Sequence, residues 1–498
     1  MSNLHSTILK SHSLKSVTLL AVLVFSSCGI PTKGVQDIDS AMAKRPNILL
    51  IVADDLGYAD VGFNGSKEIT TPELDRLSGG GIVFTSAYVP HPFCGPSRAA
   101  ILTGQYAQKI GAQLNLPPNS SSANRDNMGV PVKHRFLSKH LHNAGYRTGM
   151  IGKWHLGAAP KYHPNQRGFD FFYGFLNGGH DYFPEAYRAK YQRQTAAGGI
   201  ISDYVLPLEC NGEQVRETEY LTDAFSREAV NFVNSVSDST PFFLFLSYNA
   251  PHVPLEAKEE DLNKFKNIKN KERRTYAAMV YALDRGVGRV VAALKKNGQY
   301  EHTLIVFISD NGGKVENAAN NSPLKGGKGQ TWEGGYRVPM FFHWPEKITA
   351  GKTFNFPVTA LDFYPTFAGL ANAELLNNQF MDGKNIWLDL VSGTNPHNNS
   401  MIYALRYRHG SIDVGARKDD WKVTKVANEP WKLYNIKNDI SEANDLSREY
   451  PERLKQMVDE SHAWTQDFIR PLWYNSENEK NAWREHNMPN YPATFTVE

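Results

Sequence analysis

Short apolar segments that end abruptly in polar residues recur along the first two thirds of the chain. They cover residues 48–53, 146–151, 242–248 and 303–309. A continuous apolar run of this length is typical of a strand buried on both faces of a parallel sheet. Helical spacing of apolar residues lies between these runs, over residues 72–79, 136–144, 221–236 and 275–296. This alternation predicts an α/β fold with a mixed, mostly parallel central sheet flanked by helices.

The last quarter of the chain has a different pattern. Residues 372–400 are polar and broken, which suggests a boundary, and short strand-like segments follow. They cover residues 401–406, 413–417, 421–426 and 431–434, before a helical segment at 451–465. Tight turns between such segments predict an antiparallel sheet in a smaller C-terminal α+β subdomain. We place the large α/β domain at residues 46–385 and this subdomain, with a tail, at 386–498.

The composition is that of a soluble globular protein. Of the 498 residues, 41% are hydrophobic and 21% are charged, which is ordinary for such a protein. A chain of this length exceeds one small core, in agreement with a large and a small domain. The net charge of +3 is spread without long basic runs, so we expect no nucleic-acid partner.

The N-terminal residues have the pattern of an export signal. Lys10 and Lys15 precede an apolar run at 17–25 that is too short to cross a membrane as a helix. The residues that follow, Phe25-Ser26-Ser27-Cys28-Gly29, resemble a bacterial lipobox. In that case residues 1–27 are a signal peptide, Cys28 is lipidated and residues 28–45 are a tether. Ordinary signal-peptidase cleavage nearby is the alternative. We expect an exported protein of the periplasm or cell surface that touches the membrane only through a lipid anchor.

Three cysteines, Cys28, Cys94 and Cys210, are too few for a disulfide framework. Cys94 follows a proline-rich stretch, and a helix ending before Gly104 is predicted to begin beside it. Free N–H groups and the helix dipole would then favour negative charge at Cys94. Arg98, one turn later, is expected to point back at it. A buried structural cysteine is the alternative interpretation.

Oxygen donors follow two of the predicted strands. Asp54 and Asp55 come after the first, and Asp310 and Asn311 come after the run at 303–309. Since ligands of parallel sheets bind beyond the carboxyl ends of the strands, these side chains are expected to meet. Hard oxygen ligands select Ca²⁺ or Mg²⁺ over zinc. Each Asp taken alone could equally be a helix cap or a turn residue.

Basic and imidazole groups follow the other strands or lie in a glycine-rich loop. Lys153 and His155 end one strand, His252 follows another, and Lys328 lies among glycines that allow close approach of a ligand. Such groups bind an anion and can protonate a leaving oxygen. The histidines could also be ordinary loop residues. Together with a cation, the set indicates metal-assisted attack on an oxyanion ester, with phosphate and sulfate both open.

Several ordered motifs carry a family resemblance. Cys94-Gly95-Pro96-Ser97-Arg98 with Leu102-Thr103-Gly104 resembles the signature of formylglycine-dependent (type I, arylsulfatase-like) sulfatases, which belong to the alkaline phosphatase superfamily. Six further segments match the family in order across residues 45–446. They are Pro46-Asn47-Ile48 with Asp54-Asp55, the GKWHLG run, Ala250-Pro251-His252, Ser309-Asp310-Asn311-Gly312, GGKGQTWEGGYRVP, and Lys432-Leu433-Tyr434-Asn435 with Asn444-Asp445-Leu446. The resemblance implies an alkaline-phosphatase-like fold and hydrolysis of sulfuric esters.

The resemblance also implies the cofactors. Cys94 would be converted to Cα-formylglycine (3-oxoalanine) by a separate maturation enzyme. One hydroxyl of the hydrated aldehyde would attack sulfur and the other would then expel sulfate, a covalent route in two easier steps. Asp54, Asp55, Asp310 and Asn311, with the modified Cys94, would hold Ca²⁺ rather than Mg²⁺. The metal would polarise a sulfate oxygen and lower the pKa of the nucleophile.

Roles for the remaining residues follow from the same resemblance. Arg98 would orient the formylglycine and offset negative charge, and Lys153 and Lys328 would clamp the sulfate oxygens. His155 would be the base that drives sulfate expulsion. His252, with Lys328, would protonate the leaving alcohol.

The substrate is expected to be a sulfated oligosaccharide derived from a polysaccharide. We expect His180 and Arg408, in loops outside the shared motifs, to contact sugar, although both could be ordinary surface residues. Two other functions stay open at this point. One is a phosphodiesterase or phosphonate hydrolase of the same superfamily, and the other is a non-catalytic glycan-binding lipoprotein.

Overall fold

The computed structural model describes residues 45–117, 127–373, 375, 379–408, 410–486 and 494–497. Residues 44–498 form one compact unit. The expected signal peptide, most of the tether and the lipidation site Cys28 lie outside the described residues. None of the described helices is long and apolar enough to cross a membrane.

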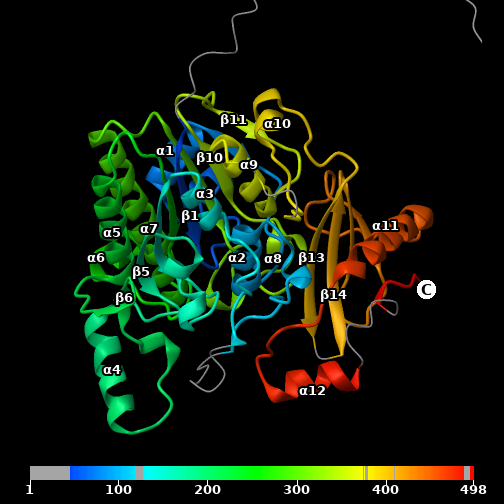
Figure 1. The fold of residues 1–498 in the computed structure, drawn as a ribbon. Helices are drawn as coiled ribbons and strands as arrows, with labels where there is room; N and C mark the ends of the chain where they lie inside the picture. Colours follow the sequence, from blue (N-terminus) through cyan, green and yellow to red (C-terminus); the bar gives the residue numbers. More distant parts are fainter. Residues whose placement is uncertain are drawn as a thin grey trace, which may run out of the picture. The chain divides into compact units, whose positions relative to one another are not determined.

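A mixed sheet of ten strands lies at the centre (Figure 1). Across the sheet the order is β11 (Lys352–Phe354), β2 (Ile82–Phe84), β10 (Met340–His343), β9 (Thr303–Ser309), β1 (Asn47–Ala53), β8 (Phe242–Ser247), β4 (Arg147–Lys153), β5 (Phe171–Phe175), β6 (Leu208–Cys210) and β7 (Glu213–Val215). The run from β9 to β5 is parallel throughout. A separate parallel pair joins β3 (Ala87–Tyr88) to β12 (Val358–Thr359). The expected mixed, mostly parallel α/β architecture is thus confirmed.

Helices cover both faces of this sheet because successive side chains of a strand point to opposite faces. In β1, Leu50 packs into one hydrophobic cluster and Leu49 into the other. The first cluster includes side chains of α2 (Cys94–Thr103), α3 (Leu137–Asn143) and α9 (Phe363–Leu370). The second includes side chains of α1 (Pro72–Gly79), α5 (Leu221–Ser235) and α7 (Lys271–Lys296). Burial on both faces explains why the central strands are continuously apolar.

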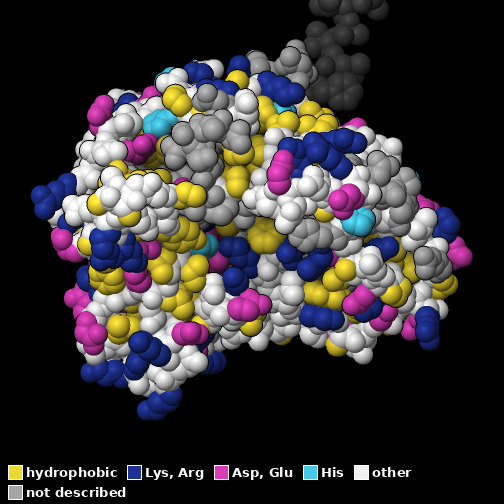
Figure 2. Space-filling view, turned by 90° about the horizontal axis from the view of Figure 1, so that it is seen from below, with side chains coloured by type: hydrophobic (Ala, Val, Ile, Leu, Met, Phe, Trp, Pro, Cys, Tyr) yellow, Lys and Arg dark blue, Asp and Glu magenta, His cyan; other side chains and the backbone are white. Residues whose placement is uncertain are grey.

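The remaining described α-helices are α4 (Pro184–Ala196), α6 (Glu259–Leu262), α8 (Glu333–Tyr336), α10 (Trp387–Ser392), α11 (Pro451–Trp464) and α12 (Glu477–Glu485). All four residues of α8 are buried. α4 projects from the lower edge of the view in Figure 1. The same side, seen from below in Figure 2, carries several groups of Lys and Arg side chains.

The predicted central elements agree closely with the structure. The four apolar runs correspond to β1, β4, β8 and β9, and the four helical patterns to α1, α3, α5 and α7. α7 begins at Lys271, four residues before the predicted start at residue 275, because the Asn270 side chain accepts a hydrogen bond from the backbone N–H of Arg273. The sheet's outer strands were not predicted, since segments of three to five residues show too little periodicity.

The C-terminal sheet is antiparallel, as predicted. β13 (Met401–Arg408), β14 (Ser411–Lys418), β15 (Trp421–Lys425) and β16 (Lys432–Asn435) lie in that order. The first hydrophobic cluster contains residues of both sheets, among them Met340 of β10 and Val414 and Leu433 of the C-terminal sheet. Both sheets therefore belong to one compact unit, and the boundary placed between residues 385 and 386 stays a prediction.

Buried charges also join the two sheets. Lys422 of β15 has no solvent exposure, and its Nζ lies 3.1 Å from Glu333 and 2.8 Å from Glu442. The second oxygen of Glu442 accepts a 2.6 Å hydrogen bond from the backbone N–H of Glu333. The hydroxyl of Tyr88 donates to Glu333 at 2.6 Å. This network anchors the start of α8, and with it the glycine-rich loop that precedes α8, to the C-terminal sheet.

Replacing Lys422 with Met should destabilise the protein strongly. The change leaves the carboxylates of Glu333 and Glu442 buried side by side without their shared cation, which costs about 3–5 kcal/mol. Urea unfolding should show this loss in the free energy of unfolding. Lys437→Met, at a side chain that is 69% exposed and pairs with Asp420, is the control and should change it by less than about 1 kcal/mol. Equal effects of the two changes would contradict a structural role for the network.

Candidate active site

The carboxyl ends of four adjacent strands bring the candidate residues to one edge of the sheet. β1 and β9 pair with Ala53 opposite Ser309, so Asp54 and Asp310 leave the sheet side by side. The backbone N–H of Asp310 donates to Ala53 O at 3.0 Å. Lys153 is the last residue of β4. The aligned parallel register therefore assembles the site from segments far apart in the sequence.

Four oxygen-bearing side chains meet there without solvent. Asp54, Asp55, Asp310 and Asn311 are at most 3% exposed. The amide nitrogen of Asn311 donates to Asp55 Oδ1 at 2.8 Å, and the backbone N–H of Asp55 donates to Asp310 Oδ1 at 3.3 Å. Burial, with the neighbouring charge of Asp54, raises the pKa of Asp310 to about 6. So much buried negative charge requires compensation.

Three cations supply part of this compensation. Lys153 Nζ lies 2.5 Å from Asp54, Lys328 Nζ lies 2.6 Å from Asp55, and Arg98 binds Asp310 at 2.8 Å. Burial by itself would raise the pKa of Asp55, but the charge of Lys328 and the hydrogen bond from Asn311 hold it below its usual value. Asp54 and Asp55 thus hold these lysines in place, and an ammonium group has three N–H donors, so each lysine can also donate to an anion.

A divalent cation fits the atoms that stay unpaired. Asp54 Oδ1, Asp55 Oδ2 and Asn311 Oδ1 are buried and lack a hydrogen-bond partner among the described residues. Donor atoms of Asp54, Asp55, Cys94 and His252 all lie within 4.8 Å of one another. Oxygen atoms predominate in the combined set, which suits a hard cation such as Ca²⁺ or Mg²⁺.

Cys94 is the first residue of α2, as the sequence predicts, and is 2% exposed. Lys328 Nζ lies 3.4 Å from its sulfur. Burial raises the pKa of the Cys94 thiol, so the unmodified side chain is neutral near pH 7. The N–H of Gly95 donates to the side chain of Asn115 at 3.0 Å, which fixes the first turn of the helix.

The hydrogen bonds of Arg98 hold it chiefly against Asp310. Its guanidinium reaches Asp310, the carbonyl of Lys153 and the hydroxyl of Ser247, and among the described residues no hydrogen bond joins it to Cys94. The side chain has no solvent exposure. Arg98 therefore offsets the negative charge of Asp310 and lies close enough to Cys94 for its charge to act there. Its expected role in orienting the formylglycine stays a prediction.

The two histidines are buried and uncharged. His155 is 5% exposed, and its Nδ1 has no hydrogen-bond partner among the described residues. Burial and the charge of Lys153 hold the pKa of His155 well below its usual value. Burial also lowers the pKa of His252 to about 3, although Asp55, 3.7 Å away, opposes the shift. A neutral imidazole can accept a proton.

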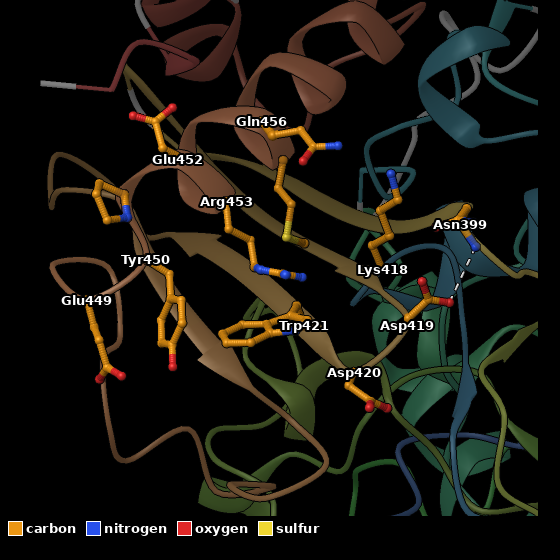
Figure 3. Close-up of a pocket in the computed structure, with 12 residues that line it drawn as sticks. Asn399, Lys418, Asp419, Asp420, Trp421, Glu449, Tyr450, Glu452, Arg453 and Gln456 are labelled. Atoms are coloured by element: carbon orange, nitrogen blue, oxygen red, sulfur yellow. Dashed lines mark hydrogen bonds between the residues drawn. The ribbon is translucent and has the colours of Figure 1, made fainter.

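A cavity of about 220 Å³ opens onto these groups. Its walls include Cys94, Asn115, His155, Asn177, Asp203, Tyr204, His252, Lys328 and Asn475. A second cavity, of about 720 Å³, lies between the β14–β15 turn and α11 (Figure 3). None of its lining residues belongs to the acidic cluster (Asp54, Asp55, Asp310 and Asn311) or to the expected anion clamp (Lys153 and Lys328). We therefore take the cavity of about 220 Å³ as the candidate active-site cavity.

The two residues expected to contact sugar lie in different surroundings. His180 has no solvent exposure, and its two ring nitrogens lie 2.6 and 2.8 Å from the carbonyls of Asp181 and Leu206. With both nitrogens occupied, it holds two backbone segments together, and direct contact with a ligand would require this loop to rearrange. Arg408 is one-third exposed and binds Asp413 at 2.5 Å, so it keeps surface for a contact.

Sequence reasoning missed several residues around the site. Arg406 of β13 donates to the carbonyl of Gly329 at 2.5 Å, and its guanidinium lies 5.0 Å from the ring centre of Phe93. It thus links the residue after Lys328 to the residue before Cys94. Ser247 and Asn115 also hold catalytic groups, as described above. An arginine in a short strand some 300 residues from Cys94 gives no sequence signal of such a contact.

With this geometry established, similarity identifies the class. The sulfatase family matches residues 46–373, and a family described as N-sulphoglucosamine sulphohydrolase, C-terminal, matches residues 327–465. The chain therefore belongs to the sulfatase family and is a sulfuric ester hydrolase with an alkaline-phosphatase-like fold.

Individual relatives agree. Ps i-CgsB, solved alone and in complex with k-i-k-neocarrahexaose, is 56% identical, covers 91% of this chain and 100% of its own, and has a TM-score of 0.89. Arylsulfatase J of Mus musculus is 32% identical over 467 residues, which are 84% of this chain and 75% of the relative. N-acetylgalactosamine-6-sulfatase of Mus musculus is 31% identical over 382 residues, 75% of this chain and 70% of the relative.

Calcium should stabilise the folded protein through the unpaired oxygens. Binding to the folded state alone adds about 2.7 kcal/mol at a concentration of 100 times Kd, which raises the midpoint of thermal unfolding. Asp55→Asn should abolish most of this rise and weaken binding in calorimetry. Asp459→Asn, at a 59% exposed side chain on α11, should keep the full response. If Asp55→Asn binds Ca²⁺ with wild-type affinity, the metal site has been assigned to the wrong residues.

Proposed function

We propose that this enzyme removes sulfate from an oligosaccharide of the carrageenan type, using Ca²⁺ and a formylglycine made from Cys94. The observation that supports the substrate most is the similarity to Ps i-CgsB, at 56% identity over that whole chain, which was solved with a neocarrahexaose. The supporting observation for the chemistry is the acidic cluster beside Cys94 and two lysines.

In this proposal Asp54, Asp55, Asp310 and Asn311 hold Ca²⁺. When bound, the cation supplies positive charge that polarises a sulfate oxygen. Ca²⁺ accepts more protein oxygens, in a more flexible geometry, than Mg²⁺, which keeps several waters. A site with three carboxylates, an amide and an oxygen derived from Cys94 therefore favours Ca²⁺. Arg98 keeps Asp310 ionised and in position.

The modified Cys94 supplies an aldehyde hydrate whose two hydroxyl groups serve attack and release in turn. A separate maturation enzyme makes this group. Since Cys94 is 2% exposed in the folded protein, that enzyme must reach the segment before the fold closes. The N-terminus of α2, which Asn115 fixes through the Gly95 N–H, adds the positive end of its helix dipole beside the anion.

The surrounding side chains position the sulfate and move protons. Lys153 and Lys328 donate to the sulfate oxygens. His155, neutral because burial lowers its pKa, accepts the proton during sulfate release. A bound sulfate ester places negative charge beside His252 and favours its protonated form, so that His252, with Lys328, can protonate the leaving alcohol.

Family membership argues against the two other functions considered from the sequence. A phosphodiesterase or phosphonate hydrolase would share the fold, and a glycan-binding lipoprotein would not need the intact acidic cluster. We further propose export to the periplasm or cell surface, with a lipid on Cys28. The supporting evidence is the N-terminal apolar run and the lipobox-like sequence after it.

Replacing Cys94 with Ala should abolish sulfate release, because no aldehyde can form. The measurement is sulfate released from a carrageenan hexasaccharide and from 4-nitrophenyl sulfate, with mass spectrometry of the Cys94 peptide to detect formylglycine. Cys210→Ala is the control and should stay active. Undiminished turnover by Cys94→Ala would falsify the proposed chemistry. Faster cleavage of an aryl phosphate diester than of the aryl sulfate would favour the phosphodiesterase, and inactivity toward every sulfate ester would favour the binding protein.

The roles of the histidines can be separated by leaving group. Nitrophenolate leaves without protonation, whereas a sugar alkoxide needs a proton. His252→Ala should therefore lower kcat on the sulfated sugar by about 10²–10⁴-fold and change nitrophenyl sulfate far less. His155→Ala should lower turnover of both, because sulfate release follows in either case. If His252→Ala slows both substrates equally, His252 is not the acid.

A further inference from the structure

A third cavity, of about 340 Å³, lies between α4 and β7. Its lining residues are Tyr187, Arg188, Tyr191, Gln192, Val205, Pro207, Gln214, Val215 and Arg216. We propose that this cavity, the α4 subsite, binds a second sulfate-bearing sugar of an extended glycan whose scissile sulfate lies in the active-site cavity. The inference rests on the proposed function, because it concerns the same substrate.

The α4 subsite is adjacent to the active-site cavity. Tyr204 lines the active-site cavity, and the next residue, Val205, lines the α4 subsite. The segment that carries α4 leaves the active-site wall after Asn177 and Gly178 and returns to it at Asp203. One chain segment thus lines both cavities, and the proposal places an extended glycan along it.

His180 holds the chain segment whose residues line the two cavities. Its ring nitrogens contact the carbonyls of Asp181 and Leu206, and the backbone N–H of Asp181 donates to the carbonyl of Tyr204 at 2.9 Å. The ring of Tyr187, on α4, packs edge-on against His180 at 4.6 Å between centres. His180 is thus a positioning residue for the residues that line both cavities.

The chemistry of the lining matches a sulfated sugar. Two arginines face the α4 subsite, and no carboxylate is among the residues that line it. Arg188 is held by Glu185 and the carbonyl of Glu217, whereas Arg216 is exposed. Guanidinium groups bind tetrahedral oxyanions through paired N–H donors. Tyrosine rings and glutamine amides add a stacking surface and hydroxyl partners.

The charge of α4 itself agrees with this assignment. The helix carries Arg188, Lys190 and Arg193 against a single acidic residue, Glu185. It projects on the side of the molecule where Figure 2 shows groups of Lys and Arg side chains. An excess of positive charge here would draw a polyanionic glycan toward the active-site cavity.

The larger cavity of Figure 3 does not fit the same ligand. Four carboxylates, those of Asp419, Asp420, Glu449 and Glu452, line it against two cationic side chains. The guanidinium of Arg453 lies 4.5 Å from the ring centre of Trp421 and covers the aromatic face that a sugar would need. Electrostatic repulsion and this covered ring leave the α4 subsite as the better match for a sulfated chain.

The test compares a long substrate with a short one. Arg216→Gln should lower kcat/KM for a sulfated carrageenan hexasaccharide about tenfold, mainly through KM, because one charged hydrogen-bonding group is lost. Turnover of 4-nitrophenyl sulfate, which cannot reach the α4 subsite, should be unchanged. Arg448→Gln, which removes an exposed charge from the C-terminal region, should affect neither substrate. A hexasaccharide kcat/KM that is unchanged, or a loss shared by both substrates, overturns the inference.

Binding separates this inference from the proposed function. Calorimetry with the hexasaccharide, in the inactive Cys94→Ala background, should show about tenfold weaker binding when Arg216 is also replaced with Gln. If active wild-type enzyme releases no sulfate from the hexasaccharide but cleaves nitrophenyl sulfate, the proposed substrate is wrong. The α4 subsite then stands only if Arg216→Gln still weakens hexasaccharide binding, and equal affinities overturn it.

Discussion

The candidate active site depends on the compensation of buried negative charge. Three carboxylates with almost no solvent exposure lie together at the carboxyl ends of β1 and β9. Lys153, Lys328 and Arg98 each pair with one of them. Burying such charges without partners would cost far more than a folded protein's net stability, so the cations are required for folding. The same ion pairs would hold the lysines in place before the proposed sulfate group binds, which would reduce reorganisation during catalysis.

The C-terminal sheet completes the site, although it supplies none of the predicted metal ligands. The Lys422 network anchors α8, and Arg406 holds Gly329 beside Lys328. Arg406 also lies against Phe93, the residue before Cys94. The nucleophile helix and the anion clamp therefore share one support from a region distant in sequence. The two sheets also share one hydrophobic core.

The residues proposed for catalysis and those expected to recognise the glycan lie in different parts of the fold. Asp54, Asp55, Asp310, Asn311 and Lys153 lie at the carboxyl ends of central strands, where the strand register sets their relative positions, and Lys328 joins them from the glycine-rich loop before α8. The residues expected to choose the glycan lie on loops, on α4 and at the end of β13, which surround the cavity. Loops and peripheral helices can change without disturbing the sheet, so one chemical centre can serve many sulfated substrates.

The sequence by itself determined the central strands, the helices between them, the helix start at Cys94 and the residues of the acidic cluster. These features depend on local patterns, namely apolar runs, caps and polar residues at strand ends, which the chain carries in short windows. Only the tertiary structure decided that Arg98 turns to Asp310, that His180 is a buried support, and that Arg406 holds the Lys328 loop. Each of these depends on which distant groups meet a side chain after folding, and long side chains follow the nearest opposite charge or unpaired carbonyl.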